Sequence, residues 1–268
     1  MIETSPRFFS RFPEQFGGKI PFIVTDLIDR LRKINATLSE GIFRLSGSAR
    51  DTSDLCYALD KGRISNWESF NNVNTVACAL KKYFRDMIPL NPLFPHNVYD
   101  DLVRISQIQD TPESIANQFR EIILSFSKPR LYTIVFLFNY LLEVESNSTK
   151  NKMNANNLAI VFAPNLICKI SHDQQDALLS NSVQNKVIST IIRHGNMIFK
   201  DISIPESAFI KDEDLPIISY PPIDKAHVER LVQMRGYRRK SIIPFVPYDL
   251  LQDPNFVRPS RIVAFDKL

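Results

Sequence analysis

One arginine lies in a stretch whose neighbouring residues are suited to presenting it. The stretch, Glu40–Gly47, reads EGIFRLSG, and its two glycines permit tight backbone turns that a Cβ atom would forbid. Phe43 and Leu45 flank Arg44, and we expect both to anchor the chain. The guanidinium of Arg44 carries a permanent charge and five donors in a fixed fork, which suits phosphate oxygens. Taken alone, the stretch is also compatible with an ordinary surface arginine.

Two further cations fall on a predicted amphipathic helix in residues 79–86, ALKKYFRD. Lys81 and Arg85 are four positions apart, so they share one helix face beside the buried stripe. Like charges at this spacing repel slightly, and an anionic partner would compensate for that repulsion. A solvated basic face is the alternative. The apolar stripe that predicts this helix consists of Val76, Leu80, Tyr83, Phe84 and Met87.

A third stretch, Asn151–Leu166, is rich in asparagine and predicts a short, mostly apolar helix. Asn154 is positioned to cap the helix, and Pro164 limits how far it continues. We expect Asn165 just past the helix end, where its amide can both donate and accept. The alternative role for asparagines here is only to satisfy backbone groups, which we expect of Asn156 and Asn157.

Taken together and in this order, the three stretches resemble the GTPase-activating domain of the Rho family, the RhoGAP domain. Residues 41–44 resemble its arginine-bearing loop, residues 80–86 its basic helix, and residues 151–166 its asparagine-rich helix. The resemblance covers roughly residues 16–200. It implies an all-helical fold and a protein that stimulates GTP hydrolysis by a Rho-, Rac- or Cdc42-like small GTPase in its GTP-bound state.

The resemblance also implies roles for four residues. Arg44 matches the arginine finger, which stabilises the negative charge that develops during GTP hydrolysis. Lys81 would contact the switch region of the GTPase, and Asn165 would hydrogen-bond near the switches. Arg85 would orient the finger loop or contact the GTPase. Such an activator supplies its group in trans: GTP and Mg²⁺ belong to the partner, and no cofactor of its own is expected.

The alternative is a catalytically inactive RhoGAP-like scaffold, although such domains often lack the finger. Two positions also depart from the family pattern. Ala163 replaces the usual glycine, which is a small change on a helical backbone and harmful only on a left-handed one. Residues 86–93, DMIPLNPL, form a longer and less acidic segment than the family's, which bears on the choice of GTPase and leaves Arg44 untouched.

The residues of a self-sufficient nucleotide hydrolase are not recognisable in the sequence. There is no GxxxxGK[ST] phosphate loop, so the chain is not expected to hold the nucleotide itself. The histidines at positions 96, 172, 194 and 227 lack ligand spacing, and no serine or cysteine nucleophile has an evident base. The remaining cationic and amide groups suit a protein that acts on phosphoryl transfer by another protein.

Helical periodicity runs through most of the chain to Phe199, and no strand-like alternation is strong enough to build a sheet. We therefore predict an all-α bundle. The expected helices are one from Pro21 to Ile34, one between Ser48 and Gly62, the basic helix after Asn74, one over 98–105, one from Thr111 to Phe126, one from Pro129 to Leu142, the asparagine-rich helix, and one over 181–199.

Three regions are predicted: an N-terminal extension (1–15), a RhoGAP domain (16–200) and a proline-rich C-terminal extension (201–268). The C-terminal extension keeps many apolar residues, so we expect it to pack on the helical domain. Two alternatives stay open. The basic cluster Lys225–Lys240 would contact anionic lipid, or Pro244–Pro247, which has PxxP spacing, would dock another protein.

Composition agrees with a globular helical protein. The chain has 268 residues, 44% of them hydrophobic, which is enough for a sizeable core, and its net charge of +4 does not imply nucleic-acid binding. Three distant cysteines without a CxxC pair favour reduced thiols in the cytoplasm. No secretory signal is recognised, and the longest apolar stretch, 134–142, is too short to cross a membrane. We expect a cytoplasmic protein with at most peripheral contact at the plasma membrane.

Overall fold

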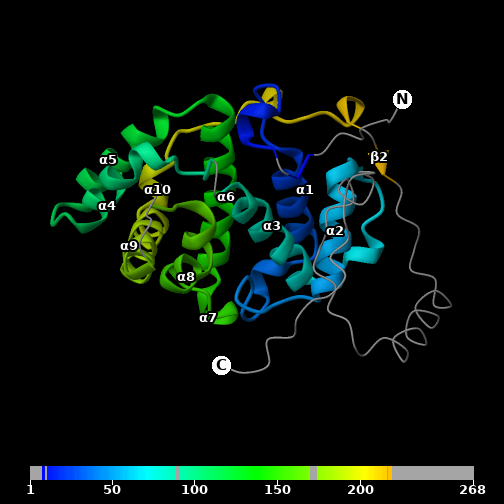
Figure 1. Ribbon diagram of the computed structural model, residues 1–268, viewed down its shortest axis with the longest axis horizontal. Helices are drawn as coiled ribbons and strands as arrows, with labels where there is room; N and C mark the ends of the chain where they lie inside the picture. Colours follow the sequence, from blue (N-terminus) through cyan, green and yellow to red (C-terminus); the bar gives the residue numbers. More distant parts are fainter. Residues whose placement is uncertain (1–7, 10, 89–90, 170–173, 216, 219–268) are drawn as a thin grey trace, which may run out of the picture. The chain divides into compact units, whose positions relative to one another are not determined.

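The computed structural model describes residues 8–9, 11–88, 91–169, 174–215 and 217–218, which all lie in the first of two compact units, Met1–Pro222. The secondary structure of the described part is helical except for two two-residue strands, which confirms the predicted all-α class (Figure 1). None of its helices is both long and apolar enough to cross a membrane. The predicted lipid-binding and PxxP segments, 225–240 and 244–247, lie outside the described residues.

The α-helices of the described part are α1 (Phe22–Lys33), α2 (Ala49–Lys61), α3 (Val73–Met87), α4 (Tyr99–Gln107), α5 (Pro112–Leu124), α6 (Lys128–Ser146), α7 (Ser148–Asn151), α8 (Ala155–Leu166), α9 (Gln174–Arg193) and α10 (Gly195–Ile198). Short 3-10 helices precede, separate and follow them: η1 (Pro13–Gln15), η2 (Ala36–Leu38), η3 (Glu68–Phe70), η4 (His96–Val98), η5 (Glu206–Ala208) and η6 (Asp212–Asp214). Two short strands, β1 (Arg63–Ile64) and β2 (Ile217–Ile218), complete the described elements.

Local capping signals fix several helix ends. Ser48 caps α2, its Oγ accepting the Asp51 N–H at 3.2 Å, and Gly62 follows the last residue of that helix. Thr111 caps α5 in the same way, accepting the Ser114 N–H at 3.2 Å. These caps were predicted, because each depends only on residues three positions apart.

Other boundaries differ from the prediction. The basic helix α3 begins before Asn74, because Asn72 is its cap and accepts the Thr75 N–H at 3.0 Å. The predicted helix 181–199 begins earlier and breaks at His194 into α9 and α10. Gly195 follows the break and packs closely against α6: a Cβ atom there would lie 2.9 Å from the Leu142 methyl carbons, which would have to shift. α5 ends two residues before Phe126, and α6 continues four residues past Leu142.

The core is built around α3, α6 and α8. α3 packs against α1, α2 and α8, and α8 packs against α9 (Figure 1). α6 is buried around most of its surface and contacts α1, α8 and α9. Its Phe138 ring packs against Phe94 and Phe199, at 6.0 and 5.6 Å between ring centroids. This packing fixes α3 and α8, the helices that carry the predicted cations and the predicted asparagine, relative to each other.

The N-terminal segment before α1 joins the core. Phe8 and Phe9 are both buried. Asp60, near the end of α2, accepts the N–H of each: its carbonyl oxygen from Phe8 at 3.3 Å, and its carboxylate from Phe9 at 2.7 Å. Phe9 also packs edge-on against Tyr83 of α3. The segment therefore contributes apolar surface to the same core as the helices.

Residues 201–218, which we call the strap, return across the domain after α10. The Ile20 N–H donates to the Ala208 carbonyl at 2.8 Å, and Phe209 packs edge-on against Phe136 of α6. The strap reaches β2, which pairs in parallel with β1 in the register Arg63 to Ile217. The sequence pattern did not predict these strands, because two-residue strands have no detectable alternation. The boundaries at 15/16 and 200/201 stay predictions.

Candidate functional site

Arg44 lies in a tight turn between η2 and α2, residues 39–47, which we call the finger loop. Two of its residues have left-handed backbone, Gly41 with φ 69° and Phe43 with φ 67°. The N–H groups of Arg44 and Leu45 both donate to the Gly41 carbonyl at 2.9 Å and close the turn. Glycine is favoured at position 41, because the positive φ would strain an L side chain and a Cβ atom would lie 2.9 Å from Leu45 Cγ.

Phe43 points into the core and leaves Arg44 outside. The Phe43 ring is fully buried and packs edge-on against Phe162 at 4.7 Å and Tyr140 at 6.2 Å. The Arg44 side chain is exposed, and within the described part of the chain it has no hydrogen bond or ion pair. The expectation that Leu45 also anchors the loop was wrong: it is 47% exposed and lies over Gly41 on the outer side of the turn.

The finger loop is fixed to the rest of the domain at three points. The contacts are Gly41 N–H to Asn151 O at 2.8 Å, Lys81 Nζ to Phe43 O, and Gly47 N–H to Cys78 Sγ at 3.4 Å. At the third point a Cβ atom on Gly47 would lie 2.5 Å from the Thr75 nitrogen, so only glycine lets the loop approach α3 this closely. The backbone on both sides of Arg44 is therefore held while its side chain is not.

The two predicted cations of α3 have different surroundings. Lys81 is half-buried, and burial lowers the pKa of its amine. Its hydrogen bond to the Phe43 carbonyl makes Lys81 a residue that orients the finger loop. The Arg85 side chain is 62% exposed and pairs with Asp86, with 3.8 Å between Nε and Oδ1. Its guanidinium is accessible to a partner protein, which fits the second of the two roles expected for it.

A surface pocket of about 500 Å³ brings three of the four predicted residues together. Lys81, Arg85 and Asn165 line it, and Arg44 lies two residues before the loop edge of the pocket. The other lining residues come from the finger loop, α2, α3 and α8 and are Ser46, Gly47, Ala49, Thr52, Ser53, Cys78, Lys82 and Val161. All the charged lining residues are cations, so the pocket suits an anionic surface.

Asn165 lies inside the last turn of α8, so the expectation that it follows the helix end was wrong. Pro164 removes only its own N–H, and the last turn still closes because the Ile167 N–H donates to the Ala163 carbonyl at 3.1 Å. The Asn165 side-chain amide donates to Val161 O at 2.7 Å. Ala163 lacks positive φ, so its methyl group fits the helix where the family usually has glycine.

The other asparagines of α8 are mainly structural. Asn154 caps the helix as predicted, its Oδ1 accepting the Asn157 N–H at 3.0 Å. The Asn157 amide satisfies a backbone group, as expected, by donating to Lys152 O at 2.8 Å. For Asn156 the expectation was wrong, because its Oδ1 accepts from the Arg193 guanidinium on α9.

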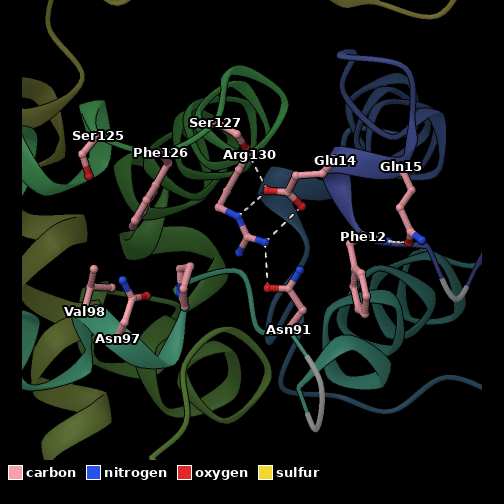
Figure 2. A pocket seen from close by; sticks show the side chains of 11 residues that line it. Phe12, Glu14, Gln15, Asn91, Asn97, Val98, Ser125, Phe126, Ser127 and Arg130 are labelled. Atoms are coloured by element: carbon pink, nitrogen blue, oxygen red, sulfur yellow. Dashed lines mark hydrogen bonds and ion pairs between the residues drawn. The ribbon is translucent and has the colours of Figure 1, made fainter.

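Sequence reasoning missed a buried arginine beside a second pocket, of about 490 Å³ (Figure 2). Arg130 of α6 pairs through two nitrogens with both Glu14 oxygens, at 2.7 and 3.1 Å. Its remaining donors reach Asn91 Oδ1 at 2.9 Å and the carbonyls of Pro92 and Leu93 at 2.6 and 2.9 Å. All five N–H groups are thus occupied, so Arg130 ties the chain between α3 and α4 to η1 and offers no donor to a ligand.

Sequence reasoning also missed Asn151, whose carbonyl accepts the Gly41 N–H. Its side chain is completely buried and bonds to backbone groups of two other segments. The only sequence signal is a polar residue between two predicted helices, which does not distinguish it from its polar neighbours. Its contacts with the finger loop and η2 join it to residues more than a hundred positions away, Gly41 and Thr37.

Comparison with known proteins agrees with this geometry. The sequence profile of the RhoGAP domain matches residues 21–171. The chain is 34% identical over 184 residues to the Rho GTPase-activating protein gacY of Dictyostelium discoideum, and 33% identical over 192 residues to human SLIT-ROBO Rho GTPase-activating protein 1. These alignments cover 68% and 71% of this chain but 25% and 17% of the relatives, so the chain spans a quarter or less of their length.

Solved structures show the same fold. The crystal structure of human Rho GTPase activating protein 15 superposes with a TM-score of 0.66 at 22% identity, covering 73% of this chain and 93% of that one. The BH domain of GRAF, the GTPase regulator associated with focal adhesion kinase, superposes with a TM-score of 0.57 at 23% identity, covering 69% and 95%.

Proposed function

Because this chain belongs to the RhoGAP domain family, we propose that it stimulates GTP hydrolysis by a Rho-family small GTPase and supplies Arg44 as an arginine finger. Membership of this family supports a Rho-family small GTPase as the class of partner. The finger and the stimulation are our proposal, as is the choice among Rho-, Rac- and Cdc42-like GTPases in the GTP-bound state.

The observation that carries the proposal is the contrast between the Arg44 side chain and its backbone. The guanidinium is exposed and has no partner among the described residues, whereas hydrogen bonds from Gly41 and Lys81 hold the turn around it. Because the backbone around Arg44 is already held, only its side-chain torsions have to be fixed when the guanidinium enters another protein's active site. Placed where negative charge develops, the guanidinium stabilises the transition state more than the ground state.

The pocket beside the finger loop supports a second part of the proposal, the docking of the GTPase. Arg85 offers an exposed guanidinium, and Asn165 offers an amide at the end of α8. Lys82 is half-buried and, like Arg85, pairs with Asp86. We assign Arg85 and Asn165 to contacts with the GTPase near its switch regions. Lys81 has a double role, because it holds the finger loop and also lines the pocket. The GTPase itself would provide GTP and Mg²⁺.

The test is phosphate release from GTP-loaded Rho, Rac and Cdc42 proteins, with wild type beside Arg44→Ala and Arg44→Lys. A finger is worth about 10³–10⁵ in rate, so Arg44→Ala should lose at least about 10³-fold. Arg44→Lys should also fail, because an ammonium lacks the planar fork. Binding to the GTP-loaded partner should remain, and the free energy of unfolding should not change, because the Arg44 side chain is exposed.

Two outcomes would overturn the proposal. Full stimulation by Arg44→Ala would mean that another group stabilises the transition state. Binding without stimulation by the wild type would make the protein a RhoGAP-like scaffold, which is the alternative function.

A cytoplasmic location and contact of residues 225–240 with anionic membrane remain part of the proposal. Co-sedimentation with liposomes of defined charge would test the membrane contact.

A further inference from the structure

Asn151 joins three segments of the chain through one buried side chain. It is the last residue of α7 and is fully buried. Its amide nitrogen donates to Val144 O in α6 at 2.7 Å and to Thr37 O in η2 at 2.8 Å. Its amide oxygen accepts the Met153 N–H at 2.7 Å, just before α8. Both N–H donors of the amide are therefore used, and the side chain can occupy only this orientation.

The backbone of Asn151 extends the same network into the finger loop. Its carbonyl accepts the Gly41 N–H at 2.8 Å, at the first left-handed residue of the turn. Thr37, which the side chain binds, lies in η2 four residues earlier. Asn151 thus holds the start of the finger loop through Gly41 and the preceding η2 through Thr37. Its side chain also connects both contacts to Val144 near the end of α6. Lys152 follows with φ 60°, which ends α7 and turns the chain toward α8.

We propose that Asn151 is the positioning residue that sets the direction of Arg44. The path is short, because Gly41 is separated from Arg44 by only two residues, one of which is the buried Phe43. Without the Asn151 side chain, the turn keeps its Phe43 anchor and its contacts with Lys81 and Cys78. It loses the bond to Thr37 and the amide contacts that place the Asn151 carbonyl against Gly41. The inference rests on the proposed function, since it assigns Asn151 a role in orienting the finger.

The competing explanation is a purely structural role. A buried amide that satisfies two carbonyls contributes to stability wherever it lies. That role would lower the unfolding midpoint of a variant without changing the maximal rate of the molecules that remain folded. A positioning role lowers the maximal rate of folded molecules while binding of the GTPase persists, because a displacement of about 1 Å at a reacting group can cost about 10²-fold.

The test uses Asn151→Ala in the full chain, at a temperature where circular dichroism shows the variant to be folded. Single-turnover hydrolysis at saturating activator gives the maximal rate, and titration with GTP-loaded GTPase gives the affinity. We expect the maximal rate to fall about 10- to 100-fold while the dissociation constant changes less than about threefold. If Asn151→Ala does not fold, Asn151→Ser, which keeps one donor, takes its place with the same readouts.

Arg120→Ala is the matched control. Arg120 also bridges two backbone carbonyls, those of Ile198 and Lys200, at 2.8 and 2.5 Å, but from α5, which packs against α4 and α10. It should destabilise the fold and leave the maximal rate unchanged. A parallel loss of rate in Arg120→Ala would show that destabilisation alone lowers the rate and would overturn the proposal.

A double variant separates this inference from the proposed function. If Asn151 acts through Arg44, then Arg44→Ala with Asn151→Ala should be no slower than Arg44→Ala alone. A full additional loss would mean that Asn151 acts by another route and would overturn the inference alone. A wild-type maximal rate in Asn151→Ala, with activity still dependent on Arg44, would do the same. No stimulation by the wild type would overturn both proposals.

Discussion

Replacement of Phe43 by glycine should leave the protein more stable than replacement by alanine. In a helix or an extended strand the order is the reverse, because glycine loses more conformational freedom on folding. Phe43, however, has left-handed backbone at φ 67°. A Cβ atom is strained in this region and glycine is not. Whether the glycine or the alanine variant is the more stable therefore reports the backbone conformation at position 43, which directs Arg44 outward.

The expected difference in the free energy of unfolding between the glycine and alanine variants follows from the terms that the two variants do not share. Both lose the same buried ring and its contacts with Phe162 and Tyr140, about 3–5 kcal/mol for truncation to alanine. Alanine retains a left-handed strain of about 1–2 kcal/mol. Glycine avoids that strain but costs about 0.5–1 kcal/mol in unfolded-state entropy. The glycine variant should therefore exceed the alanine variant by about 0.7 kcal/mol in free energy of unfolding.

Equilibrium unfolding in urea measures this difference, provided that the two variants share one m value. The matched control is the same pair of substitutions at Tyr57, an α2 residue that is 61% exposed. There the alanine variant should be more stable by about 1 kcal/mol. If alanine were also the more stable at position 43, Phe43 would not be left-handed in solution. The account of how Arg44 reaches the surface would then fail.

Two further substitutions test the supports of the fold. Burial raises the pKa of Glu14, but hydrogen bonds from Arg130 and Ser127 outweigh it and leave the pKa below its ordinary value of 4.5. The ionised carboxylate therefore stabilises the fold above about pH 4.5, and this contribution is lost as the pH falls through the folded pKa. Glu14→Gln should cost about 1–2 kcal/mol at neutral pH, and the stabilities of the two proteins should converge as the pH falls through the lowered pKa of Glu14; a pH-independent difference would contradict this. Ala163→Gly should cost about 1 kcal/mol in urea unfolding and leave GTPase stimulation unchanged, because residue 163 is helical; a stabilised variant would contradict the helical assignment.

Local features of the fold were predictable where cause and effect lie within one turn of chain. Ser48 and Thr111 cap their helices because a side-chain oxygen meets an N–H three residues later, and that spacing is legible in sequence. Boundaries set by packing were not. Gly195, at the break after α9, packs against Leu142, more than fifty residues earlier, and sequence periodicity gives no sign of that contact.

In the candidate site, too, residues marked by local motifs were predictable and contacts between distant residues were not. The order of the three motifs predicted Arg44, Lys81, Arg85 and Asn165, and the structure brings the last three to one pocket. The contacts that hold the finger loop were not predictable, because they join residues distant in sequence. Lys81 reaches the Phe43 carbonyl across 38 positions, and the Asn151 side chain reaches Thr37 across 114. Periodicity places a residue on a helix face but does not identify the carbonyl it will meet.

The strap extends the part of the chain that must be kept together when this domain is moved into another protein. Similarity to the family profile stops at residue 171, yet the strap closes over Ile20 and Phe136, and Phe8 and Phe9 fill the core from the other end. The aligned segment makes up a quarter or less of the relatives' length, so in them it is continuous with further sequence. A gene fusion joined at the edges of the similarity would carry the finger but expose the surfaces that its flanks cover. Successful recombination should therefore move residues 8–218 as one piece, including flanks that the family profile does not match.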